Sequence, residues 1–399
     1  MKRINNLFEQ IYDVKNICLA DEIARENKKI TKNIVNHDKH RKSDILKLSK
    51  SFKDLTYKTS KYKNATIYEP KERLLYILPY YPDRIAHHAI MNIMEPVWVN
   101  LFISHTYSCI KGRGIHKLAN DLKKDLCNDA EGTKYCLKLD IRKFYPSITH
   151  EILIDILKKK IKDKNLLVTL EEIIHSAPGV PIGNYLSQFF ANLYLTYFDH
   201  WVKEELKCKY YYRYADDIVI LDKDKNKLKN IFLAIKVYLT NVLNLVIKPN
   251  YQIFPVDARG IDYVGYVFFH THIKIRKSIK LKIKKLIKKY EDGKIKKEQL
   301  KLKLSAYFGW LKYCNSKRLL KLIQDKTGIV FSNWRGEKDI ISNYYNKRVY
   351  VVNSVKYSKV FRINFIYKGK AKYFETRNKR LYACINANKY PVYIKILNI

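Results

Sequence analysis

The chain has 399 residues, and its 78 lysines and arginines against 38 acidic residues give a formal net charge of +40. This excess is more than solubility requires and indicates a polyanionic partner, most naturally nucleic acid. No Cys-x-x-Cys pair, signal peptide or charge-free stretch long enough to span a membrane is present, which argues against zinc, disulfides and membrane insertion and predicts a soluble cytoplasmic protein.

The first half of the chain predicts helices followed by a strand. Residues 1–70 combine helical apolar spacing with dense charge, so we expect a basic, helical N-terminal extension. Residues 82–101 predict an apolar core helix, and the polar loop SCIKGRGIH after it is a candidate ligand contact. Residues 135–140 alternate as a strand with one buried face does. Thr149 then stands where a helix N-cap is expected.

The middle of the chain alternates helices and strands. The loop SAPGVPIGN leads into a helix expected over residues 186–206 that is buried at its start. The runs YYYRY and IVIL predict two strands joined by a tight connection that presents aspartates at its tip. An amphipathic helix, KLKNIFLAIKVYLTNVL, follows. This alternation is typical of an α+β domain.

The last third of the chain is very basic. Lysine-rich helical segments begin near residue 277, and so one-sided a charge favours a surface that contacts a nucleic-acid backbone. After about residue 328, alternating runs such as KRVYVVNSV predict strands. We therefore expect residues 328–399 to form a basic, β-rich C-terminal domain that binds RNA or single-stranded DNA.

Three aspartates form the strongest candidate for chemistry. Nucleotide transfer to a growing chain uses two divalent cations, and these require converging oxygen ligands. Asp216 and Asp217 lie at the predicted strand connection, and Asp140 ends a separate strand. Each signal is weak alone, because a surface Asp-Asp turn is commoner than a metal site.

Together the motifs resemble a known family. LKLDIRKFYPSI, GVPIGNYLSQFFANLYL, YRYADDIVIL and GIDYVGYVFF occur in the order and spacing of reverse transcriptase motifs, over roughly residues 70–320. The sequence is similar to prokaryotic enzymes of the group II intron, diversity-generating and defence-associated lineages, with the last favoured. The resemblance implies a right-hand α+β fold with fingers and palm over 71–270 and a helical thumb over 271–327.

The resemblance also implies roles for particular residues in the acidic site. Asp140 and Asp216 correspond to metal ligands, the Ile141 carbonyl is an additional candidate ligand, and Asp217 completes the catalytic triad. The implied cofactor is Mg²⁺, with Mn²⁺ as an alternative.

The family likewise implies contacts to substrates. Tyr145 falls at the position of a steric gate against a ribose 2′-hydroxyl, although a core aromatic is the alternative among 33 tyrosines. Lys111 and Arg113 resemble cations that hold the triphosphate. Lys248 stands where a lysine protonates the leaving pyrophosphate, and Gly265 resembles the primer grip.

The nucleotide pocket departs from the intron enzymes. Those relatives have Pro-Gln-Gly, whereas here Pro181 is followed by Ile182 and Gly183. A branched alkyl side chain cannot make the hydrogen bonds of the amide, which suggests reduced copying fidelity.

The resulting hypothesis is an RNA-directed DNA polymerase that copies a dedicated non-coding RNA into a DNA product from dNTPs, in bacterial antiphage defence. A mutagenic, diversity-generating reverse transcriptase is the alternative. A catalytically silent RNA-binding scaffold is the alternative from another class, although the intact aspartates argue against it. The sequence leaves open the template, the primer, the way in which the product acts and whether subunits assemble into an oligomer.

Overall fold

A computed structural model describes residues 3–26, 31–68, 72–330, 348–357, 360–367, 370–376 and 392–393. Contacts divide the chain into two compact units, Met1–Arg276 and Lys277–Ile399. The division falls six residues after the predicted end of the palm at residue 270. Within the described residues, no helix combines the length and the apolar character that crossing a bilayer demands.

The centre of the first unit is a four-stranded antiparallel sheet in the order β4-β5-β3-β6. Its strands are β3 (Tyr135–Asp140), β4 (Tyr210–Tyr214), β5 (Asp217–Asp222) and β6 (Gln252–Pro255). The predicted strands β3, β4 and β5 are confirmed. Leu137 and Leu139 are buried on one face of β3, as the period-two alternation predicted.

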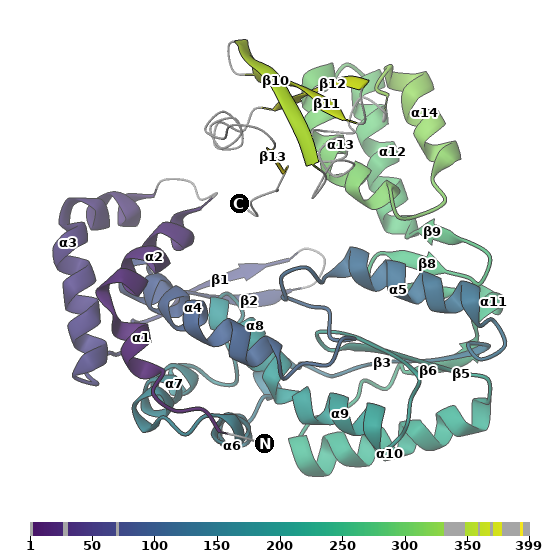
Figure 1. The fold of residues 1–399 in the computed structure, drawn as a ribbon. Coiled ribbons are helices and arrows are strands. Elements are labelled where there is room, and N and C mark those ends of the chain that lie inside the picture. Colours follow the sequence, from purple (N-terminus) through teal and green to yellow (C-terminus); the bar gives the residue numbers. More distant parts are fainter. Residues whose placement is uncertain are drawn as a thin grey trace. The chain divides into compact units, whose positions relative to one another are not determined.

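Helices cover both faces of this sheet (Figure 1). α9 (Thr196–Glu204) and α10 (Lys225–Leu243) lie on one side, and α5 (Ile115–Asn128) lies on the other. The sequence predicted one helix over 186–206, but the structure breaks it at Leu195, between α8 (Tyr185–Tyr194) and α9. Leu195 has a ψ of 3°, which turns the chain so that both helices bury apolar side chains.

The N-terminal helices are part of the first unit's core. They are α1 (Phe8–Tyr12), α2 (Val14–Arg25), α3 (Lys32–Lys53) and α4 (Ile85–Val99). Phe8, Ile11, Ile17 and Phe52 are buried in the same hydrophobic cluster as the residues of the central sheet. The helices predicted over residues 1–70 are therefore present, but their apolar faces are packed inward instead of lying on a basic surface. α4 confirms the apolar core helix predicted over residues 82–101.

A two-stranded hairpin lies between α3 and α4 in the chain. β1 (Lys63–Ile67) pairs with β2 (Arg73–Ile77), so the predicted domain boundary at residue 70 falls between two paired strands. The remaining elements of the first unit are η1 (Tyr80–Arg84), η2 (Tyr145–Ser147), α6 (His150–Lys160), α7 (Lys164–His175), α11 (Val256–Arg259), β7 (Ile261–Tyr263), β8 (Tyr266–Phe268) and β9 (Ile273–Ile275). Thr149 is the N-cap residue of α6 as predicted, but its side chain makes no capping hydrogen bond.

The described residues of the second unit form three helices and a β-sheet. Its helices are α12 (Lys277–Glu291), α13 (Lys297–Leu311) and α14 (Lys317–Thr327), which bury Ile283, Leu304 and Ile323 among other apolar side chains. Its strands, in the sheet order β12-β11-β10-β13, are β10 (Arg348–Tyr357), β11 (Val360–Tyr367), β12 (Lys370–Thr376) and β13 (Val392–Tyr393). The prediction of helices followed by strands is confirmed.

Candidate active site

The strand register brings the predicted aspartates to one end of the sheet. Ala215 and Asp216 form the two-residue connection between β4 and β5, and Ala215 has a left-handed φ of +54°. Asp217 lies directly opposite Asp140 on β3. Side chains of directly opposed residues share one face of an antiparallel sheet. Asp140 and Asp217 therefore face the same side, with Asp216 beside them in the turn.

Negative charge is concentrated at this end of the sheet. Burial, then the charge of Asp140 and that of Asp217, raise the pKa of Asp216 from 3.8 to about 6. Burial also raises the pKa of Asp217, against the opposing effect of Lys138. Desolvated carboxylates that raise one another's pKa values are stabilised by a cation placed among them.

A lysine already contacts one of these carboxylates. Lys248 Nζ lies 2.5 Å from Asp140 Oδ2, and the Lys248 backbone N–H donates to the Asp140 carbonyl at 2.8 Å. Asp140 Oδ1 is buried and accepts no hydrogen bond. The lysine that the resemblance linked to pyrophosphate thus lies within the acidic site.

Two carboxylates of this site, those of Asp140 and Asp216, are suited to bind a divalent cation. Asp140 offers an oxygen atom without a partner, and Asp216 carries a charge that its surroundings disfavour. In residues 3–26, 31–68 and 72–330 no three His, Cys, Asp or Glu side chains lie close enough to hold one ion together. Carboxylate oxygens are ligands that Mg²⁺ and Mn²⁺ accept, and the assignment of Asp140 and Asp216 as metal ligands stays a prediction. Ile141, the further candidate, donates its N–H to the Asp216 carbonyl at 3.3 Å.

Tyr145 lies close to the acidic site. It is half-buried at the start of η2, and burial raises the pKa of its phenol, with smaller contributions from Cys109 and Asp216. Its carbonyl accepts the N–H of Val180 at 2.9 Å. The chain passes so close at Gly179 that a Cβ there would lie 2.7 Å from the Tyr145 carbonyl oxygen. The structure thus joins Tyr145 to the loop that leads to Ile182.

The loop at Ile182 and Gly183 is attached to the β1–β2 hairpin. The Tyr76 N–H donates to the Ile182 carbonyl at 2.8 Å. Gly183 has a φ of +127°, and a Cβ at this position would lie 2.4 Å from the Tyr76 carbonyl oxygen. Asn184 donates to the Tyr62 hydroxyl at 2.8 Å. Only glycine fits at residue 183, because both the backbone angle and the close approach exclude a side chain.

Two predicted substrate cations lie on the loop before α5. Lys111 is exposed. Arg113 Nη1 donates to the carbonyls of Ile103 and Thr106 at 2.6 and 3.0 Å, so this guanidinium supports its own loop. The sequence did not predict this local role, since loop carbonyls leave no sequence pattern. Contact of either residue with a triphosphate stays a prediction.

Gly265 belongs to the turn between β7 and β8. Val264 and Gly265 both have positive φ values, as a two-residue hairpin turn of type I′ requires. Tyr263 next to this turn donates its hydroxyl to the Asp217 carbonyl at 2.9 Å. The hairpin is thereby attached to the strand that carries an aspartate of the triad. The primer-grip role of Gly265 stays a prediction.

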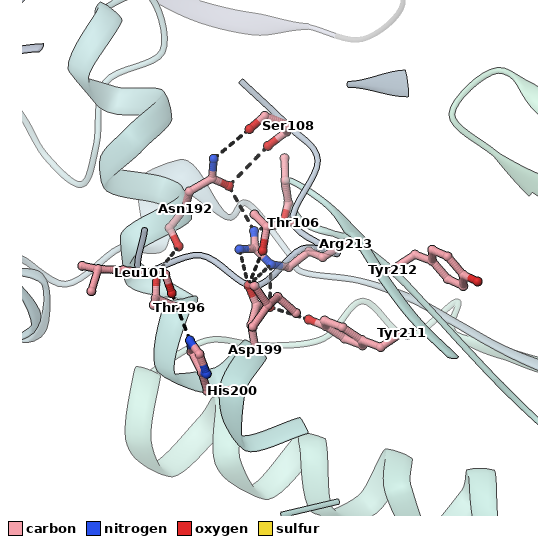
Figure 2. A network of polar contacts seen from close by, with 12 residues as sticks. Leu101, Thr106, Ser108, Asn192, Thr196, Asp199, His200, Tyr211, Tyr212 and Arg213 are labelled. Carbon is pink, nitrogen blue, oxygen red and sulfur yellow. Dashed lines mark hydrogen bonds and ion pairs between the residues drawn. The ribbon is translucent and has the colours of Figure 1, made fainter. Parts of the chain in front are cut away.

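The sequence did not predict the role of a buried arginine on β4, the strand that leads into the turn of Ala215 and Asp216. Arg213 on β4 is fully buried and pairs with Asp199 on α9, which is also fully buried (Figure 2). The available signal was the alternation in YYYRY, which places Arg213 and Tyr211 on the same face of the sheet. In the structure this face is the one covered by α9. An arginine on a buried face requires an acidic partner, but no local pattern indicates which one.

An α+β fold whose central sheet carries aspartates from two strands and a turn defines a candidate nucleotidyl-transferring polymerase. Residues 59–268 match the family described as reverse transcriptase (RNA-dependent DNA polymerase). The chain therefore belongs to the reverse transcriptase family, as its motifs predicted.

Curated relatives are distant and match only in part. The chain is 24% identical over 179 residues to the group II intron-encoded protein LtrA of Lactococcus lactis, covering 42% of this chain and 29% of that protein. It is 24% identical over 140 residues to protein YkfC of Escherichia coli, covering 32% and 36%. Nuclear intron maturase 4 of Arabidopsis thaliana is 25% identical over 142 residues, covering 33% and 17%. The chain thus spans about a third or less of the length of these relatives.

Solved structures to which the chain is similar in part include telomerases. Telomerase from Candida albicans in complex with a fragment of telomeric RNA has a TM-score of 0.42 and 12% identity, covering 73% of this chain and 63% of that chain. The corresponding complex from Candida tropicalis has a TM-score of 0.44 and 12% identity, covering 67% and 55%.

Proposed function

We propose that this protein synthesises DNA on an RNA template from dNTPs, with Asp140, Asp216 and Asp217 as the catalytic carboxylates. The observation that carries this proposal is the register that sets Asp217 opposite Asp140, with Asp216 in the adjoining turn. In this assignment residues 71–270 form the fingers and palm, and residues 271–327 form the thumb. The β-rich domain of residues 328–399 is a further site for RNA or single-stranded DNA.

The residues of the site have separate roles in this reaction. Asp140 and Asp216 would hold Mg²⁺, and the bound ion would supply positive charge that stabilises the negative charge developing on the phosphate oxygens during nucleotide transfer. Tyr145 limits the space beside the sugar and so selects dNTPs. Lys248, which contacts Asp140, lies where it can transfer a proton to the departing pyrophosphate.

The charge of the second unit supports binding of a template and a DNA product. Helix α12 buries Ile283 and Ile287 and exposes a series of lysines: Lys277, Lys280, Lys282, Lys284, Lys285, Lys288 and Lys289. Such a face attracts phosphates through counterion release, so binding weakens steeply as the salt concentration rises.

The experiment that tests this function is dNTP incorporation on a defined RNA template with a DNA primer and Mg²⁺. Wild type is compared with Asp216→Asn, and the products are sequenced. Synthesis by wild type alone supports the proposal. If neither protein extends the primer but both bind RNA, the chain is a scaffold and the proposal is wrong.

The biological setting is proposed from the resemblance to defence-associated enzymes: a dedicated non-coding RNA copied during antiphage defence. The names of the relatives favour a second setting, since LtrA is a group II intron-encoded protein. Sequencing RNA that copurifies with the protein separates the two, because one predicts a small non-coding RNA and the other an intron. A mutagenic retroelement would instead show copies of a variable gene template.

Reduced fidelity is proposed from Ile182. Its side chain cannot offer the hydrogen bonds of a glutamine, so the pocket discriminates mispaired nucleotides less strongly. Ile182→Gln should lower the error rate in sequenced products. Equal error rates for the variant and wild type would contradict this role of the residue.

A further inference from the structure

The buried pair of Arg213 and Asp199 is more extensively bonded than a simple ion pair. Arg213 Nε lies 2.7 and 3.0 Å from the two Asp199 oxygens, and Nη2 lies 2.6 Å from Oδ2. Asp199 also accepts the hydroxyls of Thr106 at 2.9 Å and Tyr211 at 2.5 Å. Both charged side chains are 0% exposed. An ion pair this deeply buried contributes little to the net free energy of folding, so we interpret it as fixing the orientation of the two side chains.

The third nitrogen of the Arg213 guanidinium points toward the turn formed by Ala215 and Asp216. Arg213 Nη1 donates to the Ala215 carbonyl at 3.0 Å and to Asn192 Oδ1 at 3.2 Å. Ala215 has a φ of +54°, which an L-residue adopts only where its surroundings impose it. The peptide group that precedes Asp216 is thus held by Arg213. The peptide group that follows it is held by the Ile141 N–H, which donates to the Asp216 carbonyl.

The same network reaches Thr106 and Ser108, in the segment that precedes Lys111 and Arg113 (Figure 2). Asn192 Nδ2 donates to the Ser108 carbonyl at 2.8 Å. The Arg213 backbone also pairs with this segment, since its N–H donates to the His105 carbonyl and its carbonyl accepts the N–H of Tyr107, both at 3.1 Å. One buried arginine therefore connects the turn that presents Asp216 to the segment that leads into the predicted triphosphate loop.

We propose that Arg213 is a positioning residue that fixes the direction of Asp216 through the Ala215 carbonyl, and thereby sets the affinity of the site for its divalent cation. Asp199 and Asn192 hold the guanidinium in the required orientation. This inference rests on the proposed function for its meaning in catalysis, but the metal affinity is measurable without synthesis.

The geometry explains why this position requires arginine. The planar guanidinium uses Nε and Nη2 for Asp199 while Nη1 reaches Ala215 and Asn192, so three partners are bound from different edges of one rigid group. A lysine retains the charge that Asp199 needs, but its single nitrogen cannot span Asp199 and the Ala215 carbonyl together. Arg213→Lys therefore removes the contact to the turn while the buried ion pair is kept.

The test compares Arg213→Lys with wild type and with a matched control, Asp21→Asn. Asp21 is also fully buried and paired with Arg25 and Arg41, but in the N-terminal helices. For each protein, Mn²⁺ affinity is measured by the paramagnetic resonance signal of the free ion, and the Mg²⁺ concentration for half-maximal dNTP incorporation is determined. Melting temperatures report on folding.

We expect Arg213→Lys to weaken Mn²⁺ binding about tenfold and to raise the half-maximal Mg²⁺ concentration similarly, as loss of a supporting contact does. Asp21→Asn should lower the melting temperature and leave both metal values unchanged. If Arg213→Lys binds Mn²⁺ as wild type does, or if Asp21→Asn weakens binding equally, the positioning role is refuted. Absence of synthesis by wild type would refute the proposed function, while the Mn²⁺ comparison would still decide on Arg213.

Discussion

Replacing Asp216 by asparagine should stabilise the metal-free protein above pH 6 while abolishing synthesis. Its folded-state pKa is raised from 3.8 to about 6, so the fold disfavours the ionised carboxyl, first through burial and then through Asp140. The free energy of unfolding of wild type therefore falls as the pH rises from about 4 to about 6, and stays lower above this range. The rise in pKa corresponds to at most about 3 kcal/mol, and screening at this half-buried site leaves about 1–2 kcal/mol.

The assay is thermal unfolding of wild type and Asp216→Asn in EDTA at pH 8 and at pH 4. A gain of about 1–2 °C in Tm per kcal/mol is expected for the variant at pH 8, because the entropy of unfolding grows with the size of the unit. The difference should vanish at pH 4, where Asp216 is protonated in the folded wild type. Adding Mg²⁺ should stabilise wild type more than the variant. A variant that is no more stable than wild type at pH 8 without metal would refute the electrostatic reasoning.

Three further substitutions test other parts of the site. Gly183→Ala places a Cβ 2.4 Å from the Tyr76 carbonyl oxygen, and should cost about 1–3 kcal/mol in urea denaturation and raise the KM for dNTPs. Gly112→Ala, at a φ of +77° with no atom within 4 Å of the added Cβ, is the control for backbone strain alone. Tyr145→Ala should increase rNTP use relative to dNTP use about tenfold, and unchanged sugar selection would exclude a gate. Lys248→Met should lower kcat, because the proposed proton donor is lost, and should lower the Mg²⁺ concentration for half-maximal synthesis, because a competing cation is removed. A higher half-maximal Mg²⁺ concentration for the variant would contradict this.

Local sequence patterns predicted the elements of the site well. Strand β3, the hairpin of β4 and β5 and helix α10 follow from alternation and amphipathic spacing, which are properties of neighbouring residues. The break at Leu195 was not predicted, because both flanking segments are apolar and helical in pattern. The inward packing of the N-terminal helices was also missed, since dense charge on one face does not show what covers the other.

The sequence by itself indicated the class of protein and a candidate site at three aspartates, because residue types, motifs and strand periodicity can be recognised without knowledge of distant contacts. Only the tertiary structure decided that Asp217 lies opposite Asp140, that Lys248 contacts Asp140, and that Arg213 holds the turn before Asp216. These contacts join segments that are far apart in the chain, or depend on a buried partner such as Asp199. They arise from strand register and from the need to pair every buried charge, and neither leaves a local signature in the sequence.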